Sequence, residues 1–429
     1  MSDQYTPSSP ENVSMRPISR GMVSNQYSVT LPDGAFQLVD GYVVTQQGPR
    51  RLGGLIPGLV DDTGSPVRLD FIAADERIED SSSFWKPDGS QLTFVVTNRY
   101  LYAMTYGSGY QPVPWVRDYT VFSATAGGGV TTIVVADDFT EDHLDTGDVL
   151  WFGDEKFPIT NIFISGTTTF TVAGEFTTTP VADDTFKILK TFKAADDYYV
   201  DFAVARNNVI LVDGGTRLTF KYDGTWLTPM IFTNDSGTVT LQGARTVTYF
   251  GERLYFGGVL ENDPSTGDIN FRNRIRWTEI VDWTKVKSAN YLDLSRTAGI
   301  IVKLLGLGSQ IVAYCTDSMY AGRQTNLVSA PYTFDLLETG GVSAVSMKAV
   351  STFFGGQLFV GPGNVYFVGG SSGIQNLGDD IVDTLQDAMR YPVRTYVRVC
   401  PDIGMAMVFC SRDGTSITDY LMYDYVSRG

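Results

Sequence analysis

The chain has 429 residues, 43% of them hydrophobic and 13% aromatic, which indicates a packed globular protein and excludes a disordered one. Its formal net charge is −16 and its longest basic run is Arg50-Arg51, which argues against a protein that grips nucleic acid by neutralising phosphates. Charged residues are only 19%, and Thr, Ser, Tyr, Phe and 44 glycines take their place, so the composition favours strands and tight turns.

The beginning of the chain lacks the basic segment and apolar stretch of a signal peptide. No run of about 18 apolar residues is present either, so we expect no stable membrane insertion. The three cysteines, Cys315, Cys400 and Cys410, lie in apolar, strand-like contexts without the spacing of a metal or redox motif. They are predicted to be buried free thiols of a protein made in a reducing cytoplasm.

Residues 1–34 are polar and rich in Ser, Pro and Asn, and we expect an extended N-terminal arm there. From residue 35 onward short apolar runs recur, each bounded by turn-forming residues, and residues 35–118 are predicted to be the first part of a repetitive β fold. The runs are Leu69–Ala73, Leu92–Thr97 and Arg99–Met104, with a hairpin turn at Pro87–Ser90.

Residues 119–192 break this period. Their runs Val130–Val135 and Thr168–Val172 alternate between polar and apolar residues, which predicts a small inserted domain that resembles a β-barrel. The insert contains the single histidine, His143, between acidic neighbours. We expect His143 to be solvated and inert.

The repeat resumes in residues 193–429, where each unit again offers three or four short strands. Six units of about 40–50 residues predict an all-β fold, a six-bladed β-propeller-like ring, because such blades bury their faces only by stacking around a ring. A pair of β-sandwiches and a β-solenoid are the alternatives. Asp379–Arg390 is predicted to be the one short helix, since acidic residues begin it and Arg390 ends it.

The residues that carry chemistry are poorly arranged for catalysis. The single histidine and the three cysteines lie apart in the sequence without zinc-ligand spacing, so we expect no zinc site built from these residue types, and the acidic pairs are expected in solvated loops. Tyr222–Trp226 is similar to the Asp-box turns of sialidase propellers but occurs once, and a type I turn explains it better. We therefore predict no catalytic, cofactor-binding or metal-binding residues, and a protein that is not an enzyme.

Arg274–Trp283 (RIRWTEIVDW) resembles a segment typical of the tail-nozzle proteins of short-tailed bacteriophages, also called tail hub or tail tubular proteins. Further resemblances follow in the order of that family. They are Tyr291–Leu294, Ala298–Leu304, Gln310–Tyr314, Ser318–Tyr320, Tyr332–Asp335, Gly340–Ser343, Val365–Val368 and Ile374–Gly378, and Asp40–Arg51 resembles the family's opening strand. Thr278 stands where the family commonly has Ser, Lys303 where it has Gly, and the 119–192 insert is not general.

The resemblance implies a structural subunit of the virion tail, assembled in the host cytoplasm. It implies a homo-oligomer, expected to be a hexamer, whose ring extends and gates the DNA channel below the portal and the head-to-tail adaptor. DNA would pass through the lumen without sequence-specific binding, and a tail fibre, tailspike or needle protein would lie nearby. No cofactor is expected. The end of the chain resembles a strand cut before its usual Trp, so we expect the natural product to continue past Gly429.

The polar stretch Glu261–Asn273 is longer than a plain hairpin turn needs, and we predict a loop there that narrows the channel. Its candidate residues are Glu261, Asn262, Asp263, Asp268, Asn270 and Arg272. A surface loop without a role is the alternative for this stretch. For the whole chain, the alternatives are a β-propeller glycan- or receptor-binding module of a virion and a propeller hydrolase.

Overall fold

The computed structural model describes residues 22–23, 38–39, 42–45, 48–51, 71–73, 75–86, 88–105, 109–193, 199–214, 218–235, 240–263, 265–294, 299–325, 327, 331–339, 342–353, 355–369, 373–400, 405–414 and 418–424. The chain divides into two compact units. One contains Gly54–Met347, and the other contains Met1–Gly53 together with Lys348–Gly429.

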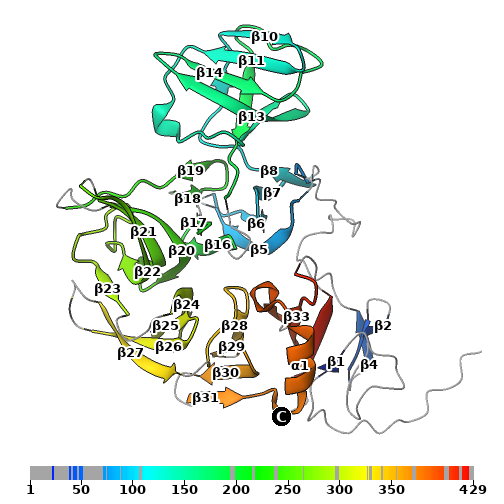
Figure 1. Ribbon diagram of the computed structural model, residues 1–429, viewed down its shortest axis with the longest axis vertical. Helices are drawn as coiled ribbons and strands as arrows, with labels where there is room; N and C mark the ends of the chain where they lie inside the picture. The colour runs from blue at the N-terminus through cyan, green and yellow to red at the C-terminus, as the bar shows by residue number, and fades with distance from the viewer. Residues whose placement is uncertain are drawn as a thin grey trace, which may run out of the picture. The chain divides into compact units, whose positions relative to one another are not determined.

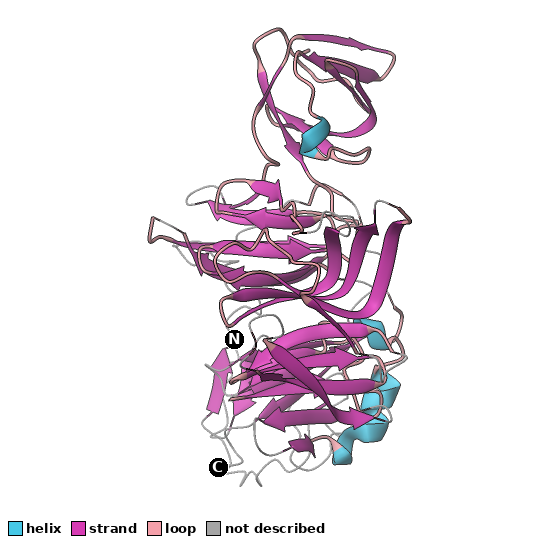
Figure 2. Ribbon diagram, turned by 90° about the vertical axis from the view of Figure 1, so that its left-hand side faces the viewer, coloured by secondary structure: helices cyan, strands magenta, loops and turns pink. Residues whose placement is uncertain are grey.

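The fold is all-β, and its blades are those of a six-bladed β-propeller, as predicted (Figure 1). Strands make up nearly all of the regular structure (Figure 2). Blade 1 contains β5 (Ile78–Trp85), β6 (Gln91–Thr97), β7 (Leu101–Thr105) and β8 (Gly109–Pro112). Blade 2 contains β16 (Asp201–Ala205), β17 (Asn208–Val212), β18 (Thr219–Tyr222) and β19 (Leu227–Pro229). Blade 3 contains β20 (Thr240–Phe250), β21 (Arg253–Asp263), β22 (Gly267–Trp277) and β23 (Tyr291–Asp293). Blade 4 contains β24 (Ile301–Leu307), β25 (Gln310–Cys315), β26 (Ser318–Gln324) and β27 (Tyr332–Thr339).

Blades 5 and 6 belong to the unit with the chain termini. Blade 5 contains β28 (Val350–Phe353), β29 (Gly356–Val360), β30 (Val365–Gly369) and β31 (Gly373–Asn376). Blade 6 contains β32 (Tyr396–Cys400), β33 (Met405–Cys410) and β34 (Asp419–Asp424), and its fourth strand is β1 (Met22–Val23), from the other end of the chain. A separate hairpin sheet contains β2 (Leu38–Val39), β3 (Tyr42–Thr45) and β4 (Gly48–Arg51).

The helix is found where the sequence predicts it. A 3-10 turn over Asp379–Ile381 continues into α1 (Val382–Ala388), which buries Leu385 and Ala388. None of the helices in the described residues has the length and apolar character needed to cross a membrane.

The middle strands show how the blades stack. In β17 four successive residues are buried, and they divide between two cores. Val209 and Leu211 belong to a core shared with blade 1, whereas Ile210 and Val212 belong to a core shared with blade 3. Because successive strand residues point to opposite faces, this blade is covered on both sides, which explains why its middle strand is continuously apolar.

A buried carboxylate joins the first strands of three successive blades. Asp201 of β16 accepts hydrogen bonds from Thr246 Oγ1 at 2.6 Å and from the backbone N–H of Val247 at 3.1 Å, both on β20. It also forms an ion pair with Lys303 of β24. Lys303 is one of the two residues that depart from the tail-nozzle pattern, and its partner on blade 2 accounts for a charged side chain at this position.

The insert is a β-barrel-like domain, as predicted. Its strands are β9 (Tyr119–Thr120), β10 (Ser123–Gly127), β11 (Val130–Val135), β12 (Val149–Phe152), β13 (Glu155–Ile164), β14 (Thr168–Val172) and β15 (Thr185–Leu189). They form one sheet in the order β10-β11-β14-β13-β12-β15-β9. Since β9 and β10 are separated by only Val121 and Phe122, one stretch of chain pairs with both ends of the sheet and curls it into a barrel.

The insert shares a continuous core with blades 1 and 2. Trp115 and Phe192, which enter and leave the insert, pack with Phe220 of β18 in that core. At the base of the insert, Lys190 is buried, with its Nζ 3.0 Å from a carboxylate oxygen of Asp148. Burial raises the pKa of Asp148, although the positive charge of Lys190 opposes this effect. The pair therefore depends on both partners being present.

The expected first strand of blade 1 needs correction. Phe71–Ala73 forms a bend rather than a strand, and Leu69 and Asp70 lie outside the described residues. The first strand of the blade is instead β5, whose sequence IEDSSSFW is mostly polar. Such a strand is hard to find from sequence, because its partly exposed face carries Ser and Asp where an apolar run is sought.

The Lys190–Asp148 pair gives a direct test of how the insert is anchored. Replacing Lys190 with Met leaves a desolvated carboxylate, and we expect the free energy of unfolding to fall by about 3–5 kcal/mol. Urea denaturation followed by tryptophan fluorescence measures this change. Lys187→Met is the matched control, because that partly buried lysine lies over the Trp151 ring and forms no ion pair with a buried carboxylate of the described residues, and its effect should stay below about 1 kcal/mol. An unchanged urea midpoint for Lys190→Met would show that the pair does not anchor the insert.

Candidate functional site: the β21–β22 hairpin

The six candidate residues lie together on one hairpin, but the hairpin is not the long loop that the sequence suggested. Strand β21 continues to Asp263 and β22 begins at Gly267, so only residues 264–266 connect them. Asp263 accepts hydrogen bonds from Ser265, which lower the pKa of its carboxyl, and Gly267 takes a positive φ of 81°. The stretch is polar because strand faces exposed to solvent tolerate polar residues. The prediction of a long loop was wrong.

Glu261 is fully buried, and two arginines of β22 neutralise it. Arg276 donates to its carboxylate through Nε at 2.8 Å and Nη2 at 2.9 Å, and Arg274 donates through Nη1 at 3.1 Å. Nη1 of Arg276 also donates to the backbone carbonyls of Lys287 and Ser288, which ties the segment before β23 to the hairpin. A buried carboxylate with two guanidinium partners fixes the register of β21 against β22. Glu261 therefore has a structural role in this hairpin.

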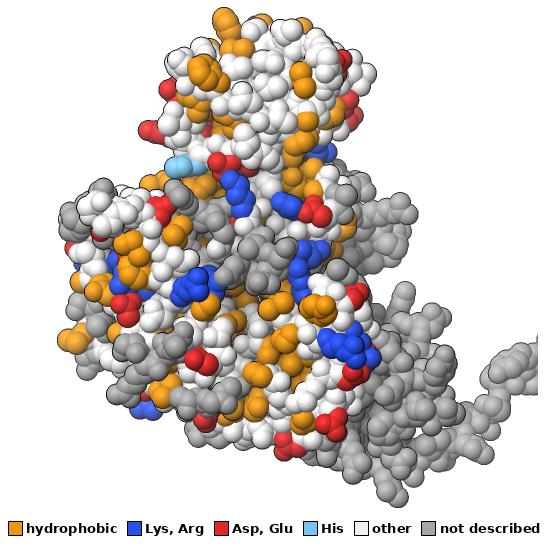
Figure 3. Space-filling view, in the orientation of Figure 1, with side chains coloured by type: hydrophobic (Ala, Val, Ile, Leu, Met, Phe, Trp, Pro, Cys, Tyr) orange, Lys and Arg blue, Asp and Glu red, His pale blue; other side chains and the backbone are white. Residues whose placement is uncertain are grey.

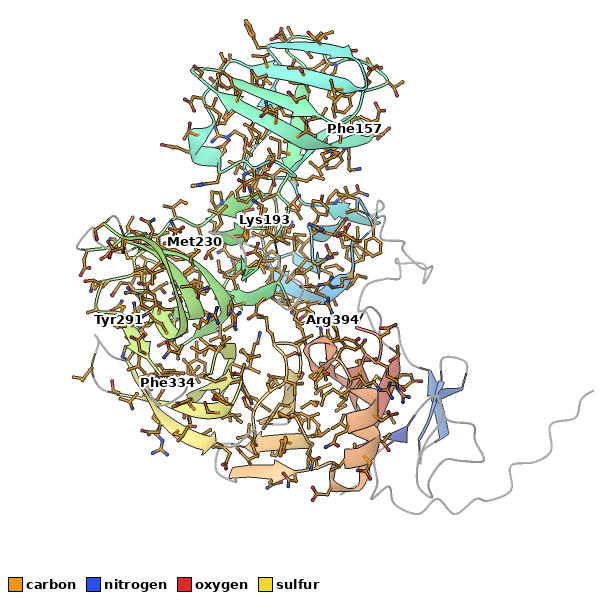
Figure 4. The ribbon with its side chains drawn as sticks, in the orientation of Figure 1. Phe157, Lys193, Met230, Tyr291, Phe334 and Arg394 are labelled. Carbon is orange, nitrogen blue, oxygen red and sulfur yellow. The ribbon has the colours of Figure 1, made fainter. Side chains whose placement is uncertain are left out.

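Aromatic rings cover the same arginines from outside. The guanidinium carbon of Arg274 lies 3.6 Å from the centre of the Phe271 ring and 4.2 Å from that of Tyr291, which is labelled in Figure 4. Arg274 also pairs with Asp293 of β23, through Nε at 2.7 Å. Burial opposes its charge, but the hydrogen bonds with Asp293 and the attraction of Glu261 raise the pKa of Arg274. The arrangement makes the base of the hairpin rigid.

The remaining candidates lie nearer the tip. Asn262 donates to Asp268 at 2.8 Å across the hairpin, while Asn270 and Arg272 are exposed. The tip therefore presents amide groups and both signs of charge to solvent. This chemistry suits repeated weak contacts with a polar surface better than tight binding of one ligand.

Gly258 permits this hairpin to curve. It has a φ of 62° at the point where the pairing of β21 with β22 shifts register. A Cβ atom there would lie 2.9 Å from Cδ of Arg245. Burial, together with the nearby charge of Arg272, lowers the pKa of Arg245 to about 10. A β-bulge with a glycine is a common way to bend strands.

The segment that resembles the tail-nozzle family lies at the base of the hairpin. Trp277 is buried, and the Thr278 hydroxyl accepts from the backbone N–H of Leu254 at 3.1 Å. Trp283 packs edge-on against Tyr249 and donates to the carbonyl of Glu252 at 3.2 Å. Glu252 in turn pairs with Arg206 in the β16–β17 turn of blade 2. These residues hold blade 3 together and connect it to blade 2.

The other residue types singled out in the sequence form no catalytic arrangement in the described residues. Cys315 and Cys410 are buried free thiols, as predicted, and burial raises the pKa of each to about 12. The side chain of Cys400 lies outside the described part. His143 is exposed and has a left-handed backbone (Figure 3). Asp223 accepts from the N–H groups of Thr225 and Trp226, as in a simple turn. Within the described ranges, no cluster of three His, Cys, Asp or Glu residues is placed to hold a metal ion.

Sequence reasoning missed the two polar networks that organise this region. Glu261 pairs with residues 13 and 15 positions away across a turn, and Asp201 pairs with Lys303 at a separation of 102 residues. The regular spacing of Arg274 and Arg276 along one strand face was a usable signal for the first network. The second had none, because it depends on the order in which the blades stack.

No family model matches the chain, and no curated protein sequence matches it. Similar solved structures include the extracellular domain of the hybrid two-component system BT4673 from B. thetaiotaomicron, at 10% identity and a TM-score of 0.27, covering 69% of this chain and 32% of that one. The phage phi92 endosialidase has 13% identity and a TM-score of 0.27, with coverage of 97% and 69%. Apo AztD from Citrobacter koseri has 13% identity and a TM-score of 0.31, with coverage of 77% and 75%. The chain spans about a third of the length of the BT4673 domain. Likenesses at this level concern the fold alone.

The Glu261 network is tested by Glu261→Gln, which keeps the shape of the side chain but leaves two guanidinium groups without a buried anion. We expect a loss of about 3 kcal/mol in the free energy of unfolding, and faster amide exchange in β22. Asp263→Asn, two residues along the same strand at the turn, is the control and should leave the free energy of unfolding nearly unchanged, because exposed charges contribute little to stability. Equal stability of the Glu261→Gln variant and the unmodified chain would contradict a structural role for Glu261.

Proposed function

We propose that this chain is a non-enzymatic structural subunit of a phage tail nozzle. Several copies would form a ring that extends the DNA channel below the portal and adaptor of the virion. The ring would hold back packaged DNA until infection and then conduct it. The observation that carries the proposal is the ordered series of resemblances from Arg274 to Gly378, whose described residues include strands of three successive blades.

The local role of the resembling residues supports the proposal. Arg274, Arg276, Trp277 and Trp283 all maintain the base of the β21–β22 hairpin and its link to the neighbouring blade. A ring subunit of a pressurised channel needs such rigid joints more than it needs an active site. The dominance of paired, buried charges over solvent-facing reactive groups is consistent with this requirement.

The charge of the chain also suits a conduit. Each copy has a formal net charge of −16, and a channel wall that shares this acidic character would repel DNA passing close to it. At physiological salt this repulsion extends only about 8 Å, so it acts where the wall approaches the polymer. The negative charge of the chain would therefore act on the DNA mainly where the lumen is narrow.

We assign the narrow part to the tip of the β21–β22 hairpin. Asn270 and Arg272 are exposed there, and Asn262, Asp263 and Asp268 are partly exposed. Glu261 is not one of the residues proposed to face the DNA, because its carboxylate is buried against Arg274 and Arg276. The tip would touch DNA through weak polar contacts. The tips of all copies in the ring would surround the DNA symmetrically.

The assembly is tested by native mass measurement and negative-stain imaging of the purified chain, alone and after incubation with a phage portal–adaptor complex. We expect a closed ring that caps the adaptor end of the complex, with the six copies that the resemblance implies, because head-to-tail contacts between identical copies form a ring where their rotation closes. The portal without its adaptor is the control and should stay uncapped. A chain that remains monomeric and ignores the complex would contradict the proposal, and binding to glycans would then favour the receptor-binding alternative.

A further inference from the structure

The fourth strand of blade 4 differs from those of the other blades. Fourth strands have two residues in β1, three in β19 and β23, and four in β8 and β31. Strand β27 has eight. In the part of the chain that the structure describes, β27 pairs with β26 alone, so its other edge lies open. Proteins usually keep open edges short, because unpaired N–H and C=O groups attract other strands.

The open edge is rigid and already shaped as a strand. From Tyr332 to Leu336 it follows β26 residue by residue, and a bulge at Leu337 ends this regular part. Phe334 fixes it in place by lying over Gly322 of β26, where a Cβ atom would come within 2.8 Å of the ring (Phe334 is labelled in Figure 4). Alternate backbone groups of this segment point away from β26. An incoming strand would find hydrogen-bonding groups that need no further ordering.

The side chains define the chemistry of a partner. Phe334 and Leu336 share one face of the strand, and Thr333 and Asp335 share the other. Leu336 and Leu337 are 37% and 40% exposed, which places two adjacent leucines in water at the end of the edge. The charged residues of the strand, Asp335 and Glu338, are both acidic. Asp335 lies 3.7 Å from Arg323 of β26, but both side chains of this ion pair are largely exposed, and such a pair contributes little, so Asp335 can still attract a basic partner. A complementary strand therefore has apolar residues on one face and basic or neutral polar residues on the other.

We propose that β27 is a docking edge for an extended strand of a different polypeptide, which adds a fifth strand to blade 4. A second copy of this chain is a poor occupant, because two acidic β27 edges would face each other in a chain of net charge −16. Strand addition takes its affinity from main-chain hydrogen bonds and its specificity from alternate side chains. The proposal does not depend on the nozzle function.

Hydrogen–deuterium exchange of the full chain tests this directly. The probe is a short peptide of alternating Val and Lys, and the control peptide has the same charge but carries prolines that prevent strand pairing. With the first peptide we expect amides in residues 332–337 to exchange about tenfold more slowly, because the new backbone bonds protect them. With the second peptide we expect no change. A peptide of alternating Val and Glu should also have no effect, since the exposed Asp335 and the net charge of −16 repel it.

Leu336→Asp is expected to weaken binding of the Val–Lys peptide about tenfold, by placing a charge where the partner is apolar. Leu327→Asp is the matched control, because Leu327 is 63% exposed but lies outside β27. Three results would overturn the proposal: no slowing in β27, slowing confined to another strand, or equal slowing by the proline peptide. Dimers of the chain that protect β27 without any peptide would assign the edge to self-association instead. All of these exchange measurements use the purified full chain, whether or not it forms a ring.

Discussion

The structure depends on one constraint, that a four-stranded blade has two apolar faces and cannot bury both by itself. The buried residues of β17 show the consequence, since Val209 and Leu211 join one core while Ile210 and Val212 join the next. A middle strand with this pattern needs a neighbouring blade on each side to cover its two apolar faces. The same requirement explains the continuity between the insert and blades 1 and 2, where Trp115, Phe192 and Phe220 form one core. Stacking of blades, rather than the stability of any single sheet, maintains the fold.

Buried charges then determine how the strands and blades align. Asp201 connects the first strands of blades 2, 3 and 4, Asp148 and Lys190 connect the insert to its base, and Glu261 with Arg274 and Arg276 aligns the longest hairpin. Buried ion pairs add little net stability over apolar packing, but each is costly to break. Their value here is to make one register far more favourable than its neighbours, because a shift by one residue would leave a charge unpaired in the interior. A subunit that transmits force along a channel would benefit from such joints.

Much of the fold was predictable from sequence because the signals are local. The blade period, the alternating strands of the insert, the helix at Asp379 and the burial of Cys315 and Cys410 all follow from patterns within a few residues. What failed depends on distant partners. Strand β5 is too polar to be recognised without β6 beside it, and β1 has only two residues, Met22 and Val23, whose partners are Met422 and Leu421. The Glu261–Asn273 stretch looked like a loop because its exposed face is polar, and the arginines that pair with Glu261 identify it as a strand only once the hairpin is seen.

Imaging of an intact phage particle that contains this chain tests the proposed nozzle role most directly. Cryo-electron microscopy of the tail, at a resolution that separates strands, should place copies of this propeller in a ring directly below the adaptor, with the tips of the β21–β22 hairpins toward the lumen. A ring in that place with another part of the chain at the narrowest point would keep the nozzle role and reject the hairpin assignment. A particle in which the propeller lies outside the channel, as a peripheral module on the tail surface, would contradict the central claim.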